Sequence, residues 1–178
     1  GYIIGLPMGI VLTVTDKDGI RPNAAVYKVL DVISNLLRSI PFIILLIVLI
    51  PFTRFVVGRS YGSTATIVPL TIAAAPYIAR MVESSLKEVD AGVIEAARSM
   101  GASDFQIVTK VMLVEARTSL IVGATISLGT ILGYSAMAGT VGGGGLGDIA
   151  IRYGYTRWQT DIMVVTVVLL VILFQIFQ

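Results

Sequence analysis

The side chains that could do chemistry gather in one polar stretch of 35 residues, from Glu83 to Arg117, between two strongly apolar segments. The chain has no His and no Cys, which excludes imidazole bases, thiolate nucleophiles, disulfides and most zinc or haem sites. No nucleophile, base and orienting group occur together, so the charges indicate binding rather than catalysis. The stretch holds ten of the chain's 13 basic and 11 acidic residues: Glu83, Lys87, Glu88, Asp90, Glu95, Arg98, Asp104, Lys110, Glu115 and Arg117.

The spacing within this stretch predicts two short helices that meet at a bend. Glu95 and Arg98 lie one helical turn apart and are expected to pair. Gly101 can adopt a positive φ and is expected to end the first helix. Ser103 followed by Gln106 is a capping box that begins the second helix. Apolar residues recur on one face at steps of three and four: Val89, Val93, Ala96 or Ala97, Met100, Phe105, Val108, Val111 and Met112.

Two interpretations of this helical loop are open, a helix lying on lipid or a docking element for a cytoplasmic protein. A helix that lies on the membrane surface is usually distinctly basic. Here six acidic and four basic side chains make the stretch slightly acidic. The lack of a basic excess favours a protein partner.

Composition places the chain in a membrane. Hydrophobic residues make up 56% of it and charged residues only 13%, whereas soluble domains carry about 25% charged residues. The net charge of +2 is too small to indicate a nucleic-acid partner. We therefore expect an all-α, polytopic membrane helical bundle surrounded by lipid.

Apolar windows predict five transmembrane helices in a single domain over residues 1–178. The first is expected to be partial, because residues 1–14 would form a helix of about 21 Å against a hydrocarbon core of about 30 Å. We read it as the second half of a truncated span, since no basic region precedes it as in a signal peptide. The expected spans are 1–14, 38–57, 65–82, 118–137 and 160–178, with the polar loop at 83–117.

Basic residues predict the orientation of these spans. Cytoplasmic loops carry an excess of Lys and Arg. The side of the first and third loops holds nine of them, and the other side holds four, Arg54, Arg59, Arg152 and Arg157. The polar loop and the C-terminus are therefore expected in the cytoplasm. The nine are Lys17, Arg21, Lys28, Arg38, Arg80, Lys87, Arg98, Lys110 and Arg117.

The polar loop resembles the E-A-A loop of ABC importer permeases, whose pattern is E-A-A-x3-G-x9-I-x-L-P. The chain departs from it at Val114 and Arg117, where the family commonly has Pro. Without those prolines the loop could continue into the fourth span without a break. The matching residues are Glu95, Ala96, Ala97, Gly101, Val111 and Leu113. The resemblance implies a coupling helix, seated in a groove of a separate ATPase subunit, with the contact residues Glu95, Ala96, Ala97, Met100 and Gly101.

Further stretches resemble the methionine-importer permease subfamily: residues 37–42, 75–83, 133–139, 144–147 and 153–155. This resemblance implies a homodimer in the bacterial cytoplasmic (inner) membrane. It also implies a dimer of ABC ATPase subunits and a periplasmic or lipoprotein substrate-binding protein as partners. The implied substrate is L-methionine, possibly also D-methionine, or a similar amino acid.

The residues agree with an energy source outside the chain. No G-x-x-x-x-G-K-[ST] loop occurs, and the glycine run at 142–147 lacks its Lys and Ser or Thr. We expect that run to be a turn. No acidic residue lies at an expected span centre, where ion-coupled transporters keep ionisable groups. The chain is thus expected to be a non-catalytic subunit without cofactors, with ATP bound by its partner.

The fourth span is the candidate translocation path. Its small residues permit close helix contact, and its hydroxyls leave room for a small amphipathic solute. Ser127, Tyr134 and Ser135 are expected to line the path, and Met137 to form a gate contact across a dimer axis. Arg80 and Glu83, three residues apart near the end of the third span, are expected to pair.

Two alternatives remain open at this point. The chain could be an ABC importer permease for another small solute, such as a different amino acid or an organic ion. It could also be a non-transporting membrane scaffold that recruits a soluble partner through the same loop.

Overall fold

The computed structural model describes residues 1–177, which form helices and connecting loops without a strand in that range. The described chain divides into two compact units. The first comprises residues 1–38 and 74–124, and the second comprises residues 39–73 and 125–178. The long helices α5 (Ser63–Lys87) and α9 (Arg117–Ala138) contribute residues to both units.

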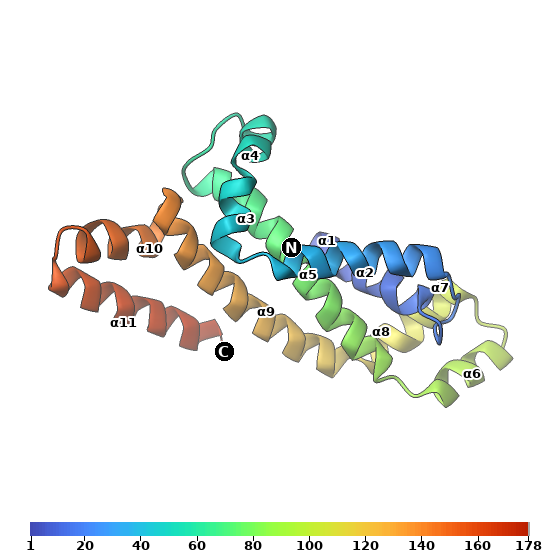
Figure 1. Cartoon of the computed structure of the whole chain (residues 1–178). Helices are drawn as coiled ribbons and strands as arrows, with labels where there is room; N and C mark the ends of the chain where they lie inside the picture. The colour runs from blue at the N-terminus through green and yellow to red at the C-terminus, as the bar shows by residue number, and fades with distance from the viewer. Residues whose placement is uncertain (178) are drawn as a thin grey trace. The chain divides into compact units, whose positions relative to one another are not determined.

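In the first unit, α1 (Tyr2–Thr15) and α2 (Ala24–Ser39) lie along the later part of α5 (Figure 1). Gly5 and Gly9 of α1 permit the close approach to α5. A Cβ on Gly5 would lie 2.7 Å from Ile78 Cβ, and one on Gly9 would lie 2.6 Å from Val82 Cβ. The two glycines are four residues apart, the spacing by which small residues bring membrane helices together.

Gly9→Ala is expected to lower the free energy of unfolding by about 1–3 kcal/mol, because the added methyl group overlaps the backbone of α5. Thermal unfolding of the detergent-solubilised protein measures this change. Ile3→Ala on the same helix is the control, since Ile3 is 91% exposed. Equal midpoints for Gly9→Ala and the unaltered protein would contradict the close packing of α1 on α5.

The rest of the first unit contains the polar loop. It comprises α6 (Ala91–Ser99), α7 (Asp104–Gln106), the π-helix η1 (Ile107–Met112) and α8 (Leu113–Glu115), which leads to α9. Ile107 and Met112 are buried and fix this segment to the unit. The segment is therefore an ordered part of the fold and not an extended linker.

The second unit contains α3 (Phe42–Val48), α4 (Ile50–Val57) and the C-terminal hairpin. Its core joins Phe42, Leu46 and Ala138, and the ring of Tyr134 stacks on Phe42 with centroids 4.6 Å apart. The chain then passes through the 3-10 helix η2 (Gly139–Val141), α10 (Gly145–Ile149), the π-helix η3 (Ala150–Tyr155) and α11 (Thr160–Phe177).

The first half of the glycine run, residues 142–144, forms the predicted turn between η2 and α10, whereas residues 145–147 begin α10. Gly142, Gly144 and Gly145 all have positive φ. A Cβ on Gly147 would lie 2.0 Å from the carbonyl oxygen of Ala136, so the returning chain passes directly against the end of α9.

Three helices among residues 1–177 are long and apolar enough to cross a membrane: Ser63–Lys87, Arg117–Val141 and Thr160–Phe177. They match the expected spans at 65–82, 118–137 and 160–178. The expected span at 38–57 is divided into α3 and α4 at Leu49, and the pair that passes the same test is α2 with α3, bent by 104°. The helix α1 is apolar but only 14 residues long, so a total of five spans stays a prediction.

Candidate functional site

The helix α6 is delimited by local interactions at both ends, of which the sequence predicted the one at Gly101. Asp90 caps its N-terminus by accepting a hydrogen bond of 2.7 Å from the amide of Gly92. Gly101 has a φ of +83°, and a Cβ there would meet nothing within 4 Å. The requirement for glycine is therefore one of backbone conformation and not of space.

The second helix begins with the predicted capping box. The amide of Ser103 donates to Oε1 of Gln106 at 2.9 Å, and the amide of Gln106 donates to Oγ of Ser103 at 3.4 Å. The loop does not pass into the fourth span as one continuous α-helix, contrary to the expectation. The turn residue Ala116 separates α8 from α9, although its amide still donates to the carbonyl of Met112.

The apolar face of α6 is divided between the fold and the exterior. Ala97 is buried against the unit, whereas Met100 is 82% exposed. Exposed side chains continue this surface onto the second helix at Phe105. We call the exposed set the coupling surface: Val93, Glu95, Ala96, Met100 and Phe105, of which Glu95 lies nearly opposite Val93 around α6.

Glu95 contributes its carboxylate to the coupling surface, and within residues 1–177 no hydrogen bond or ion pair engages it. The prediction that Glu95 pairs with Arg98 is wrong. Within residues 1–177, neither an ion pair nor a hydrogen bond joins these two side chains. Arg98 instead donates through Nη2 to the carbonyl oxygen of Ile20 at 3.1 Å, in the loop after α1. The reason is that the long guanidinium reaches across to that loop, which spacing along α6 alone cannot reveal.

A groove of about 580 Å³ lies between that loop, the end of α5 and α6. Its charged lining alternates in sign, so it presents no large field of one sign. The charged residues that line it are Asp16, Lys17, Asp18, Lys87, Glu95 and Arg98.

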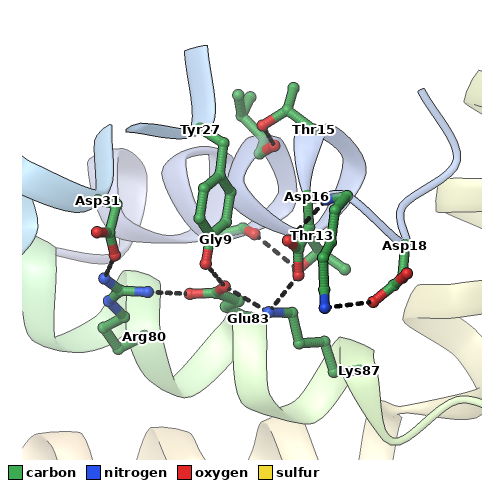
Figure 2. Close-up of polar contacts among 12 residues, drawn as sticks. Gly9, Thr13, Thr15, Asp16, Asp18, Tyr27, Asp31, Arg80, Glu83 and Lys87 are labelled. Atoms are coloured by element: carbon green, nitrogen blue, oxygen red, sulfur yellow. Dashed lines mark hydrogen bonds and ion pairs between the residues drawn. The ribbon is translucent and has the colours of Figure 1, made fainter. Parts of the chain in front are cut away.

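A buried carboxylate on α5, Glu83, organises the polar contacts of the first unit (Figure 2). Glu83 is only 4% exposed. It accepts hydrogen bonds from Nη1 of Arg80 at 2.7 Å, from Nζ of Lys87 at 2.8 Å and from the hydroxyl of Tyr27 at 3.2 Å. The predicted pair of Arg80 and Glu83 is thus confirmed, within a larger set of contacts.

The same two cations also hold side chains from α2 and from the end of α1 (Figure 2). Arg80 pairs with Asp31, and Lys87 pairs with Oδ2 of Asp16 at 2.6 Å. The hydrogen bond from Lys87 holds the pKa of the Asp16 carboxyl below its ordinary value, against the opposing effect of burial. We call these residues the Glu83 cluster: Asp16, Tyr27, Asp31, Arg80, Glu83 and Lys87.

The contribution of α2 to the Glu83 cluster was not predicted, although the sequence contains a pattern that indicates it, a polar stripe along the helix. Tyr27, Asp31 and Asn35 recur every four residues, and all three donate to or accept from α5 side chains. The opposite face of α2 is apolar and exposed, with Val29 at 59% and Leu36 at 62%. Such a helix turns its polar side inward, as expected where the exterior is lipid.

The candidate path residues on α9 do not share one face. Ser127 is buried and Tyr134, seven residues later, packs on Phe42. Ser135 and Met137 are exposed, and a step of two residues places them on nearly opposite sides of the helix. A single copy of α9 therefore cannot direct all four residues at one path, and their role stays a prediction.

Comparison with known proteins gives consistent matches. The family model described as binding-protein-dependent transport system inner membrane component matches residues 5–178. The probable D-methionine transport system permease protein of Vibrio cholerae serotype O1 is 51% identical over 178 residues, which cover 100% of this chain and 79% of that protein. The D-methionine transport system permease protein of Escherichia coli K12 is 56% identical over 139 residues, which cover 78% of this chain and 64% of that protein.

Solved structures match over nearly the whole chain. A chain of the methionine ABC transporter MetNI in an inward-facing conformation is 54% identical, with a TM-score of 0.97, over 99% of this chain and 82% of that chain. An amino acid ABC transporter crystallised with histidines matches with a TM-score of 0.74 at 21% identity, over 99% of this chain and 81% of that one, which is a likeness of fold alone.

Proposed function

Because this chain belongs to the family of binding-protein-dependent transport system inner membrane components, we propose that it is the permease subunit of an ATP-driven importer of methionine. It is a multi-pass protein of the inner membrane. The relatives that support the substrate are D-methionine permeases at 51% and 56% identity. The proposal includes both enantiomers of methionine as substrates.

The observation that carries the proposal is the coupling surface. Exposed apolar side chains and the carboxylate of Glu95 lie on α6 at the position that the E-A-A spacing marks, while the buried Ala97 fixes the helix to the fold. An exposed apolar patch on an ordered helix is typical of a docking surface. We assign it to an ATPase subunit dimer in the cytoplasm, with Glu95, Ala96 and Met100 as contacts and Ala97 and Gly101 as their structural support.

The remaining assignments follow from this role. The chain itself is non-catalytic, and ATP is bound and hydrolysed by the partner. Two copies of the chain form the permease, and a periplasmic or lipoprotein substrate-binding protein delivers the solute. The polar loop and the C-terminus face the cytoplasm.

Uptake by proteoliposomes tests the proposal. The full-length gene product is reconstituted with its ATPase and its binding protein, and labelled L-methionine uptake is measured with ATP on the side of the coupling surface. We expect ATP-dependent accumulation that excess D-methionine reduces. Uptake of only another solute would replace methionine as the substrate, and stable ATPase binding without any uptake would favour a scaffold.

Met137→Ala is expected to raise ATP-independent leak of methionine and to lower ATP-driven accumulation, because it removes the bulk that would close the path. Met137 is 45% exposed on α9. Leu128→Ala is a matched control, since Leu128 is 43% exposed and lies nine residues, or two and a half turns, away on the opposite side of the helix. Unchanged leak and uptake in Met137→Ala would remove Met137 from the gate.

A further inference from the structure

The loop after α1 connects three helices of the first unit that carry different parts of the proposed function. Its residues 16–23 follow α1 directly and precede α2. Arg98 of α6 contacts it at Ile20, and Lys87 of α5 contacts it at Asp16. The coupling helix α6 thus has a direct polar contact with the segment that joins α1 to α2, in addition to its covalent continuation towards α9.

This loop is built to be stiff. The amide of Arg21 donates to the carbonyl of Val14 at 3.0 Å, and the amide of Asn23 donates to the carbonyl of Thr15 at 2.9 Å. A Cβ on Gly19 would lie 2.4 Å from the carbonyl oxygen of Thr13, so the loop folds tightly onto the last turn of α1. A displacement applied at Ile20 is therefore carried to α1 with little internal bending.

The Glu83 cluster joins α2 to α5 and to the end of α1. Tyr27 and Asp31 on α2 bind Glu83 and Arg80, and Asp16 at the end of α1 binds Lys87. Removing one partner from a buried ion pair leaves an uncompensated charge, which strongly disfavours separation of these helices. The helices α1, α2 and α5 are thereby held together around the buried carboxylate of Glu83, although the side chain of Lys87 is 42% exposed.

We propose that the loop 16–23 is a strut that transmits displacement of the coupling helix to α1 and α2, with Arg98 and Asp16 as its two positioning residues. The proposal rests on the proposed function, because displacement of α6 requires a docked ATPase. Arg98 holds the strut on the α6 side, and Asp16 holds it on the α5 side through Lys87. The two contacts are separate anchors of one loop: loss of the Arg98 contact uncouples the loop from α6, and loss of the Asp16 contact releases it from α5.

The test compares Asp16→Asn, Arg98→Gln and the double variant in the full-length protein, reconstituted with ATPase and binding protein. The measured quantity is methionine imported per ATP hydrolysed. Each single variant is expected to lower this ratio about fivefold or more, with ATPase co-purification retained. The double variant is expected to lower the ratio at least as far as either single variant, because the two contacts are separate anchors of one loop.

Matched variants separate this role from a structural one. Arg98→Lys keeps a donor for the Ile20 carbonyl and is expected to restore much of the ratio. Lys110→Gln removes an exposed charge from the same polar loop and is expected to leave the ratio unchanged. Asp16→Asn is expected to fold because Lys87 keeps Glu83 as a partner. If Asp16→Asn nevertheless fails to fold, the strut is tested by Arg98→Gln and Arg98→Lys alone. A ratio of methionine imported per ATP hydrolysed that is unchanged in Arg98→Gln would then overturn it.

The two possible failures are distinguishable. Wild-type protein without ATP-dependent uptake would overturn the proposed function. Wild-type uptake with unchanged ratios in folded Asp16→Asn and Arg98→Gln would overturn the strut alone. A lowered ratio in Arg98→Gln with a normal ratio in folded Asp16→Asn would also overturn it, since Arg98 would then act through docking.

Discussion

Glu95→Arg is expected to abolish co-purification of the chain with its ATPase subunit and, with it, ATP-driven methionine uptake. The carboxylate is exposed and has no intrachain partner among residues 1–177, so its reversal leaves the fold intact. In a docked interface the new guanidinium would face groups arranged for an anion, and like-charge contacts of this kind cost several kcal/mol. Pull-down from solubilised membranes measures the association.

Lys110→Glu is the control for Glu95→Arg. It also reverses an exposed charge in the polar loop, but on the second helix and outside the coupling surface. Association and uptake are expected to persist in this variant. Normal association of Glu95→Arg would remove Glu95 from the docking contact, and loss of association in both variants would show that the effect of charge reversal in the polar loop is not specific to Glu95.

Met100→Asp is expected to reduce uptake by a hundredfold or more. Met100 is 82% exposed in the isolated chain. Docking of a partner over position 100 would bury the introduced carboxylate without a compensating charge. An uncompensated buried charge costs about 3–5 kcal/mol, which corresponds to a loss of about two to four orders of magnitude in affinity. Uptake by proteoliposomes at a fixed ATPase concentration measures the change.

Met100→Leu accompanies this variant and is expected to keep most of the uptake, because it preserves an apolar side chain of similar volume. Thermal unfolding of both variants should match the unaltered chain, since the fold does not use this side chain. Uptake by Met100→Asp at the unaltered rate would contradict a docked partner over Met100.

Local signals in the sequence predicted most of the polar loop. The end of α6 at Gly101 depends on the φ of one residue, and the start of α7 depends on two hydrogen bonds between Ser103 and Gln106. Interactions between residues at most four apart can be predicted from sequence, because helix geometry alone determines the distances between their atoms.

Contacts between distant residues were the part that spacing could not predict. Glu95 and Arg98 have a spacing that permits a pair, yet Arg98 contacts Ile20 across 78 residues of sequence. The partners of Glu83 on α2 were missed for a related reason. Apolar windows do not reveal which face of a helix meets its neighbour, and α2 turns its polar stripe of Tyr27, Asp31 and Asn35 toward α5.

The division of residues 38–57 has a local cause that the sequence contains. Pro51 lies at the start of α4 and has no amide hydrogen to donate to the helix that ends at Val48. Pro41 likewise separates α2 from α3. Hydropathy windows average over such breaks, so they identified an apolar segment correctly and could not resolve its two helices.

Photo-crosslinking from Met100→Cys tests the central claim, that α6 is the surface on which the ATPase docks. The chain has no cysteine, so this substitution supplies a unique thiol for a maleimide–benzophenone probe. We expect a covalent adduct with the ATPase subunit in the assembled transporter, and none from the control Tyr61→Cys. Tyr61 is 75% exposed in the loop between α4 and α5. An active transporter that gives no adduct from position 100, or equal adducts from both positions, would contradict the central claim.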